Sequence, residues 1–335
     1  MSRELISNFS MIDVGGKRLT DRRAVAAGTI YLGPNAFAKV RDKTLPKGDC
    51  FPMAEIAGVN GAKQCATMLP MCHPLPLDQV LVTFELDHEA HAVRAFCEAA
   101  AHAKTGVEME ALAGVNAALL CIWDLCKGTD PVLRLSAIEL LTKTGGKSGV
   151  WINPEAQIPD WVMARLPAQT PLEGRSIAVV VMSDRASDGT YADESGQYLV
   201  DSLTEMGATL CQYTVIPDNA DTIESTILGI CETHDPHVIL CTGGTGPGPR
   251  DVTPLVLQSH LNPELPGLGE WLRSESAVYT KTAWLSRMGG GLIGRSLIIT
   301  LPGSLQAVKE CFGIFMEGLP KAIVMIEKQG RKGRL

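Results

Sequence analysis

The sequence predicts two domains of different fold class, an α+β domain followed by an α/β domain with a mostly parallel sheet. Strand-like and helical runs alternate in the second half, whereas the first half has two strands and a long apolar helix, and a proline-rich stretch separates the halves. At 335 residues the chain is long enough to bury two cores. We expect domains at 1–149 and 176–335, joined by a linker at 150–175.

Two segments define the first domain. Residues 81–101 contain two strand-like runs around the polar turn DHEAH, and residues 108–128 have the pattern of a long apolar helix. Partial segregation of strands and helices indicates an α+β fold. The segment that follows has no sustained period, and its prolines interrupt both helix and sheet, which predicts an extended linker. These prolines are Pro154, Pro159, Pro167 and Pro171.

The second domain is defined by apolar runs that alternate with helical stretches. The strand-like runs lie at 177–182, 211–216, 237–241 and 296–301. The helical stretches lie at about 193–206, at 223–232, after Pro254 and from near Ser304. This alternation predicts a parallel sheet covered on both faces, in which ligands bind beyond the carboxyl ends of the strands. The residues predicted at that edge are Ser183 and Asp184, Asp218, Gly243 to Asp251, and Ser304.

The loop TGGTGPGPRDVTP, residues 242–254, directly follows a strand-like run and holds four glycines and three prolines. It is not a Walker loop, because Gly248 is followed by Pro249 and Arg250 instead of Lys-Ser/Thr. It also fails the GxGxxG fingerprint, since the last glycine comes one residue too early. A tight turn that binds nothing is the alternative, but the acids Asp218 and Asp251 favour phosphate binding.

The composition limits which binding partners and which cellular compartment are expected for this protein. The net charge of −7 argues against a general nucleic-acid binder, and no apolar run reaches the length of a membrane span. The ten cysteines form no CxxC pair and the N-terminus has no signal-peptide core, so we expect a cytoplasmic protein. A basic cluster within this acidic chain indicates either a small anionic ligand or a solvated surface: Lys39, Arg41, Lys43 and Lys47.

Asp124 and Lys127 are three residues apart in the predicted helix, so they share a face and can pair. An exposed pair is the simple interpretation, and proton transfer is the functional one. Other chargeable residues near glycine turns favour a polyanionic nucleotide whose ring is protonated and rearranged. These residues are Lys47, His73, Glu108, Glu110, Lys143 and Lys147.

The first half, from about Ser10 to Gly149, closely resembles the MoaC family through MIDVGGK, KGD, IAGVNGAK, CHPL, KTGVEMEAL, DLCK and GGKSG, in that order. The resemblance implies a ferredoxin-like α+β domain that converts cyclised dihydro-GTP (3′,8-cyclo-7,8-dihydroguanosine triphosphate) to cyclic pyranopterin monophosphate and pyrophosphate, a lyase reaction. It implies a catalytic Asp124 with Lys127 as its partner, and a homo-oligomer, a hexamer built from dimers with sites between subunits. The implied substrate-binding residues are Lys47, Met71, Cys72, His73, Glu108, Met109, Glu110, Lys143 and Lys147.

The second half resembles the MoaB/MogA family of molybdopterin-binding domains through MSDRAS, DESG, IPDN, the glycine loop, PGLGEWLR, LSRMGGG and LPGS. The resemblance implies transfer of AMP from ATP to molybdopterin with Mg²⁺ held by the catalytic Asp218 and Asp251, and no tightly bound organic cofactor. It implies phosphate binding at Gly243, Gly244, Thr245 and Gly246, and a pterin pocket completed by Ser183, Asp184 and Ser304.

Two positions depart from the MoaB/MogA pattern, Leu255 after RDVTP and Leu305 after LPGS, and both are expected at the rim of the site. They leave a second function open for this half, that of a non-catalytic pterin-binding or assembly module. ATP turnover would distinguish the enzyme from such a module. Arg287 is expected either to contact an anionic group or to lie on the surface. The two resemblances together predict a bifunctional cytoplasmic protein of molybdenum cofactor biosynthesis that binds cyclised dihydro-GTP, molybdopterin and ATP, without nucleic acid or membrane.

Overall fold

The chain divides into two compact units, Met1–Pro167 and Ala168–Leu335, in a computed structural model that describes residues 9–146, 149–168 and 170–332. The predicted two-domain architecture is therefore confirmed. Each unit has its own sheet and its own buried apolar core.

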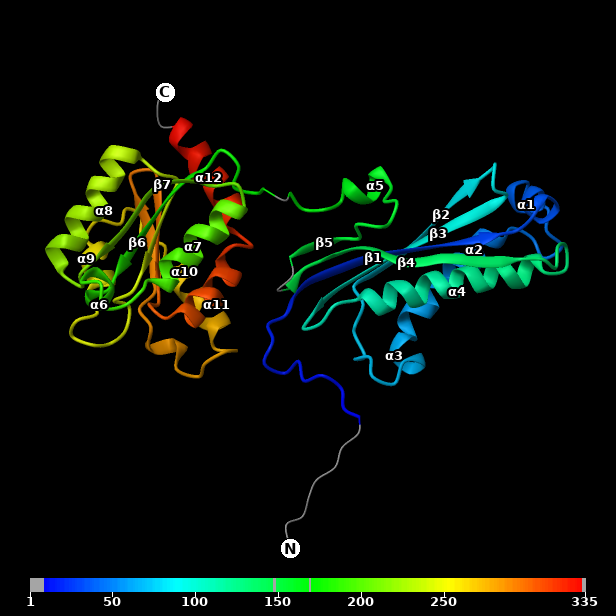
Figure 1. The fold of residues 1–335 in the computed structure, drawn as a ribbon, viewed down its shortest axis with the longest axis horizontal. Helices are drawn as coiled ribbons and strands as arrows, with labels where there is room; N and C mark the ends of the chain where they lie inside the picture. The colour runs from blue at the N-terminus through cyan, green and yellow to red at the C-terminus, as the bar shows by residue number, and fades with distance from the viewer. Residues whose placement is uncertain (1–8, 147–148, 169, 333–335) are drawn as a thin grey trace, which may run out of the picture. The chain divides into compact units, whose positions relative to one another are not determined.

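The first unit contains a five-stranded antiparallel sheet in the order β2-β3-β1-β4-β5 (Figure 1). Its strands are β1 (Thr20–Tyr31), β2 (Gln79–Asp87), β3 (Ala92–Ala103), β4 (Arg134–Thr144) and β5 (Val150–Ile152). The two strands predicted around DHEAH are β2 and β3, whereas β1 and β4 were not predicted. The unit is α+β, with elements in the order β-α-β-β-α-β before β5.

Helices cover one face of this sheet, with α4 running along it in Figure 1. They are α1 (Pro34–Arg41), α2 (Cys50–Lys63), α3 (Cys65–Met68) and α4 (Glu108–Cys126). Close packing of α2 on α4 depends on residues without side chains: a β-carbon on Gly58 would lie 3.1 Å from the Gly114 carbonyl oxygen, and one on Gly61 would overlap Ala117. The two helices therefore form one layer over the small apolar residues of β1 and β3.

The other face of the first sheet is covered by part of the segment predicted to be a linker. β5 pairs with β4, and α5 (Asp160–Met163) inserts Val162 into a cluster with Phe96 and Leu141. The Trp161 ring packs edge-on against Phe96, with 5.3 Å between the ring centroids. Residues 150–163 thus belong to the first unit's packing, while Leu172 is fully buried in the second unit's core.

A buried carboxylate also holds this segment to the sheet. Glu98 on β3 is only 2% exposed, and it pairs with Arg23 on β1 and with Arg165 just beyond α5, whose Nη1 lies 2.5 Å from Glu98 Oε2. Arg165 also lies over the Trp161 ring, 5.1 Å from its centroid. A buried carboxylate needs such partners, because an unpaired charge is costly in a core.

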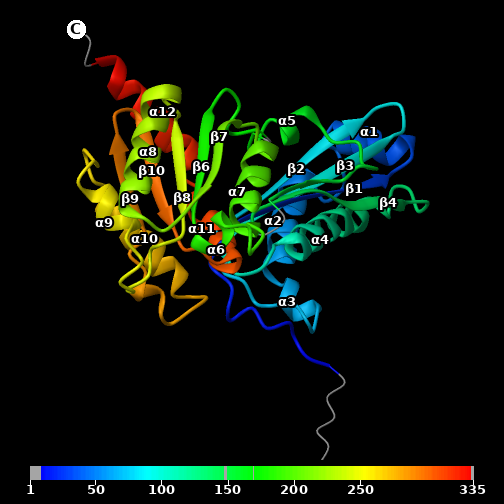
Figure 2. The same cartoon turned by 60° about the vertical axis from the view of Figure 1, so that its left-hand side comes forward.

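The second unit contains a five-stranded sheet in the order β7-β6-β8-β10-β9 (Figure 2). Its strands are β6 (Ser176–Met182), β7 (Thr209–Ile216), β8 (Val238–Thr242), β9 (Gly289–Ile293) and β10 (Ser296–Leu301). All pairs are parallel except β9 with β10, which confirms the prediction of a mostly parallel sheet. β9 was not predicted, because its triple glycine is typical of a turn.

Helices cover both faces of the second sheet, as expected for a parallel sheet. One face carries α7 (Glu194–Glu205), α10 (Pro266–Ser276), α11 (Leu305–Phe315) and α12 (Leu319–Lys332). The opposite face carries α8 (Ala220–His234) and α9 (Thr253–Gln258), as Figure 1 shows. Two short helical turns, α6 (Asp184–Ser187) and η2 (Ala283–Leu285), lie in the connections at the edge of the sheet.

α4 is the one helix in the described residues that is long and apolar enough to cross a membrane. In the described structure, 56% of its most apolar window is buried inside the protein. It is the central helix of the first unit's core.

Candidate functional sites

Asp124 in the last turn of α4 lies between two lysines. Its Oδ1 accepts from Lys127 Nζ at 2.7 Å, and its Oδ2 accepts from Lys47 Nζ at 3.1 Å. All three side chains are more than half exposed. The hydrogen bond from Lys127, and next that from Lys47, hold the pKa of Asp124 below its usual value. The group is an ionised acid with two cations, open to solvent.

A second charged cluster lies at the opposite end of α4. Glu108 Oε1 in the first turn accepts from Lys143 Nζ on β4 at 3.0 Å. The Arg22 guanidinium of β1 also faces this cluster: burial lowers its pKa, and the charge of Glu108 partly offsets that effect. Arg22 was not predicted as a site residue, because the strand that carries it was not predicted.

Glu110 lies beside this second cluster and is almost fully buried. Burial raises its pKa, and the neighbouring charge of Glu108 adds to the shift. Its carboxyl group contacts the Cys65 thiol, which in turn contacts Cys72. These contacts bring the CHPL segment, residues 72–75, to the start of α4.

Three further predicted residues adjoin this second cluster: Met109 is in the first turn of α4, and Met71 and His73 flank Cys72 in the sequence. Met71 and Met109 are both exposed apolar side chains, and His73 is partly buried. Lys147 lies outside the described residues. Exposed methionines next to charged groups give this end of α4 a surface suited to a partly apolar ligand.

The two clusters cannot surround one small molecule within a single chain. Asp124 lies sixteen residues beyond Glu108 on one continuous helix, which corresponds to about 24 Å at 1.5 Å per residue. Lys47 and Lys127 belong to the far cluster, and Lys143, Glu110 and Cys72 to the near one. The structure therefore separates the residues that the sequence assigned to one site.

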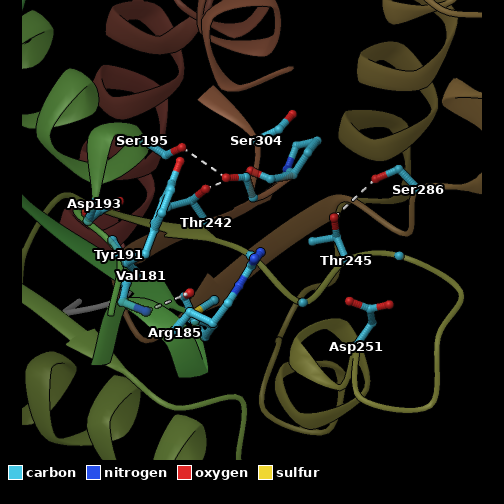
Figure 3. Close-up of a pocket in the computed structure, with 18 of the residues that line it drawn as sticks. Val181, Arg185, Tyr191, Asp193, Ser195, Thr242, Thr245, Asp251, Ser286 and Ser304 are labelled. Carbon is cyan, nitrogen blue, oxygen red and sulfur yellow. Dashed lines mark hydrogen bonds between the residues drawn. The ribbon is translucent and has the colours of Figure 1, made fainter. Parts of the chain in front are cut away.

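The second unit has a cavity of about 620 Å³ at the carboxyl ends of β6, β8 and β10. Figure 3 shows its walls, with Thr245 and Asp251 on the loop side and Ser304 opposite. Seven of the predicted residues line the cavity, namely Ser183, Gly243, Gly244, Thr245, Gly246, Asp251 and Ser304. Leu255 and Leu305 are not among the lining residues, so the two departures from the family pattern do not alter the cavity wall.

The glycine loop is held in a conformation that few other residues could adopt. Gly243 has φ +109° and a β-carbon there would overlap the Met182 carbonyl oxygen; Gly244 has φ +62°. Arg287 holds the loop at two points through its guanidinium group. Its Nη2 and Nε donate to the Gly246 carbonyl oxygen at 2.7 and 3.0 Å, and Nη2 also donates to the Asp251 carbonyl oxygen. The Arg287 side chain therefore binds the protein's own backbone.

Asp184 and Asp218 join the ends of β6 and β7 by reciprocal hydrogen bonds. The Asp218 backbone N–H donates to Asp184 Oδ1 at 3.0 Å, and the Asp184 N–H donates to Asp218 Oδ2 at 3.3 Å. Arg250 of the glycine loop pairs with Asp184. Neither aspartate is among the residues that line the cavity. Asp218 lies beside Gly244 and Asp184 pairs with Arg250, so the two acids connect the glycine loop to the ends of β6 and β7.

The donor set beside Gly244 fits a magnesium ion. Asp218 Oδ1 and Thr253 Oγ1 are buried without hydrogen-bond partners in the described residues, and a β-carbon on Gly244 would lie 3.3 Å from each of Asp218 Oδ1 and Thr253 Cβ. Burial raises the pKa of Asp218, and the charge of Asp251 raises it further. Two carboxylates and a hydroxyl match the one or two carboxylates that hold Mg²⁺ together with substrate phosphates. No group of three or more His, Cys, Asp or Glu side chains is arranged for a metal among the described residues.

Several lining residues were not predicted. Arg185 and Tyr191 follow β6, Asp193 and Ser195 stand at the start of α7, and Thr282 and Ser286 flank η2. The rule that predicted Asp184 also applies to Arg185, since both follow the end of the same strand. Thr282 and Ser286 come from the connection between α10 and β9; Ser286 lies in the LSRMGGG motif but was not assigned to the site, and Thr282 lies outside every motif that was identified.

Both halves match known families. Residues 11–146 match the MoaC family, and residues 178–321 match the family described as a probable molybdopterin binding domain. The protein is therefore of the class that combines a MoaC domain with a molybdopterin-binding domain of the MoaB/MogA type.

Relatives of the same two-part organisation extend over almost the whole chain. The molybdenum cofactor biosynthesis bifunctional protein of Synechococcus elongatus is 39% identical over 95% of this chain and 97% of the relative. The protein of that name from Chlorobaculum tepidum is 36% identical over 96% of this chain and 95% of the relative. The chain belongs to the family of bifunctional molybdenum cofactor biosynthesis proteins.

Solved structures of single-domain proteins also match the chain. MogA is 33% identical, covering 45% of this chain and 99% of MogA, with a TM-score of 0.43. Molybdenum cofactor biosynthesis protein B is 32% identical, covering 48% of this chain and 99% of that protein, with a TM-score of 0.44.

Proposed function

We propose that the first unit, a ferredoxin-like domain, converts 3′,8-cyclo-7,8-dihydroguanosine triphosphate to cyclic pyranopterin monophosphate and pyrophosphate. Membership of the MoaC family and the β-α-β-β-α-β order support this assignment. The observation that carries it is Asp124 held between Lys47 and Lys127.

The chemistry of that trio suits proton transfer on a polyphosphate. Asp124 is an ionised carboxylate between two lysines, which lower its pKa, and in this proposal it accepts a proton from the substrate. Lys127 can return a proton, and both lysines supply positive charge where the pyrophosphate leaves. Lys143 and His73 bind the same substrate in this proposal.

The separation of the two clusters along α4 supports a site completed by a second copy of the chain. In a two-fold arrangement, the Asp124 end of one copy can meet the Glu108 end of its partner. Exposed apolar side chains on α2 and α4, including Met53, Ile56 and Leu120, favour such a contact. The proposed assembly is a homo-oligomer, a trimer or hexamer, and of these the hexamer, built from three two-fold pairs, contains the contact that the shared site requires.

Mixing two inactive chains tests this function and the shared site together. Asp124→Asn and His73→Ala chains should each lose pyrophosphate release from the cyclised nucleotide. Their co-assembled mixture should recover about a quarter of wild-type activity, because half of the two-fold pairs contain one intact site of two. No recovery would refute a site shared between two copies, and full activity of either single variant would refute its role.

We also propose that the second unit binds molybdopterin and transfers AMP to it from ATP with Mg²⁺. An oxygen of the molybdopterin phosphate attacks the α-phosphorus of ATP, the bond to the β-phosphate breaks, and pyrophosphate leaves. Asp218, Asp251 and Thr253 would hold Mg²⁺, which offsets the negative charge of the two phosphate-bearing substrates. The orphaned Asp218 Oδ1 beside the glycine loop is the observation that carries this proposal.

A single assay tests the second function. The full chain given molybdopterin, ATP and Mg²⁺ should form adenylylated molybdopterin, and Asp251→Ala should abolish it. Molybdopterin binding without nucleotide turnover would instead support a non-catalytic pterin-binding module. The proposed location is the cytoplasm, which is supported by ten free cysteine thiols.

A further inference from the structure

Three arginines surround the cavity of the second unit, and they differ in what they bind. Arg250 pairs with Asp184, and Arg287 donates to backbone carbonyl oxygens of the glycine loop. Arg185 has no carboxylate partner among the described residues, although it lies directly after Asp184 in the sequence. Two of the three guanidinium groups are therefore committed to the protein itself, and one is not.

The Arg185 side chain extends into the cavity. Figure 3 shows it reaching from the β6 side toward the glycine loop, below Thr242. Its guanidinium carbon lies 5.9 Å from the centroid of the Tyr191 ring, and the Tyr191 backbone N–H donates to the Arg185 carbonyl oxygen at 3.0 Å. The turn after β6 thus places a cation and an aromatic face side by side, which favours one orientation of the guanidinium.

The carboxylates that line the cavity accept hydrogen bonds from groups other than Arg185. Asp193 accepts from the Gly196 backbone N–H at 2.9 Å and from the Tyr213 hydroxyl at 2.6 Å. Asp251 accepts from the Gly248 backbone N–H at 2.9 Å. In the part of the chain that the structure describes, Arg185 is the one cationic side chain that lines the cavity. The cavity therefore presents an unpaired positive charge to its ligand.

We propose that Arg185, oriented by Tyr191, binds a phosphate group of the ligand in this cavity. A guanidinium binds phosphate through two parallel N–H···O contacts, and the glycine loop opposite supplies backbone donors to the same kind of group. The proposal rests on the proposed function of the second unit. The phosphate of molybdopterin and those of ATP share this chemistry, and the experiment separates them.

Equilibrium binding to the full chain tests the role of Arg185. The ligands are molybdopterin, its dephosphorylated form, and ATP with Mg²⁺. The variants are Arg185→Gln, Arg185→Lys and the control Arg295→Ala; Arg295 lies in the turn between β9 and β10, and its guanidinium pairs with Asp235 at the end of α8. Arg185→Gln should weaken binding of the phosphorylated pterin about 10- to 100-fold, the usual effect of losing a charge-assisted contact. Arg185→Lys should recover part of this loss, and Arg295→Ala should bind as wild type.

The pattern across ligands assigns the phosphate. A loss for molybdopterin that disappears with the dephosphorylated pterin identifies the pterin phosphate, and a loss confined to ATP identifies the nucleotide. Equal affinities of wild type and Arg185→Gln for all ligands would overturn the proposal and leave the proposed function intact. The same loss for both pterins, with none for ATP, would also overturn it. Wild-type protein that binds neither molybdopterin nor ATP would refute the proposed function itself, and this inference with it.

Discussion

The two units assemble their candidate sites in opposite ways. In the second unit, residues from three strand ends, the turn before α7 and one later connection line a single cavity. In the first unit, the charged residues occupy two ends of one helix, with about 24 Å between Glu108 and Asp124. One chain therefore forms the whole cavity of the second unit, whereas the two charged clusters of the first unit stay apart within one chain.

The difference follows from the two sheet types. Parallel strands all end at one edge, so loops far apart in the sequence meet there. An antiparallel sheet covered by α4 has no such common edge, and functional residues collect wherever a helix or strand ends. Four predictions test or sharpen this contrast, in order of decreasing expected effect.

The largest effect is expected at Asp124. Asp124→Asn should slow pyrophosphate release from the cyclised nucleotide about 10²- to 10⁴-fold, because the variant cannot accept a proton. AMP transfer by the second unit should keep its wild-type rate. Both rates are measured on the same preparation, with Glu89→Gln in the β2–β3 turn as a charge-removal control. A parallel loss of both activities would show that the two sites are not independent.

The second prediction concerns the stability of α5, the short helix that packs against the sheet of the first unit. Arg165→Ala should lower the local stability of the α5 segment by about 2 kcal/mol, because the buried Glu98 keeps only Arg23 as a partner. Hydrogen exchange of the α5 backbone amides measures this opening directly. Arg41→Ala, which removes an exposed pair with Asp42, should change exchange little. Unaltered α5 protection in Arg165→Ala would mean that apolar packing alone fixes the segment.

A smaller effect is expected at Arg287, which donates hydrogen bonds to the backbone of the glycine loop. Arg287→Ala should reduce kcat/KM for AMP transfer about tenfold, since the loop loses hydrogen bonds to two carbonyl oxygens without losing a ligand contact. Arg287→Lys should not restore it, because an ammonium group cannot reproduce the planar donor fork. Steady-state kinetics decide the point, and rescue by lysine would contradict a bracing role.

The smallest change in stability is expected at Asp218, where the expected effect on activity is large. Asp218→Asn should abolish AMP transfer yet stabilise the metal-free protein by about 1 kcal/mol at pH 7, because it removes the negative charge from a carboxylate whose Oδ1 is buried without a partner in the described residues. The pKa of Asp218 in the folded state lies above its usual value. The ionised carboxylate therefore destabilises the fold fully at a pH above the raised pKa, and this destabilisation is absent at a pH below the usual pKa. Urea unfolding across this range should show the gain fading as the pH falls. A variant less stable at every pH would refute the assignment.

Much of the second unit could be predicted because its central strands are continuous apolar runs, as in β6, β8 and β10. β9 was missed because its glycines have no strand preference; backbone proximity selects them, since a β-carbon at Gly290 would overlap the Ile298 carbonyl oxygen. β1 was missed for a related reason. It is rich in alanine, which is uncommon in strands but fits between two packed layers.

The site of the first unit was less predictable than the cavity of the second. Strand ends in a parallel sheet locate Ser183 and the glycine loop without further knowledge. Motif order along the first half gives no information on distance, so it did not reveal that a full helix separates Asp124 from Glu108 within one chain. The distance between the two acids becomes known only when the residues between them are seen to form one continuous helix.

That length also limits how the first unit can vary. Substitutions along the exposed side of α4 leave its two ends where they are, but one inserted residue would turn Asp124 about 100° around the helix axis and away from Lys47. The same insertion would lengthen the interval to Glu108 by about 1.5 Å. The segment between these acids should therefore tolerate changes of residue type far better than changes in the number of residues.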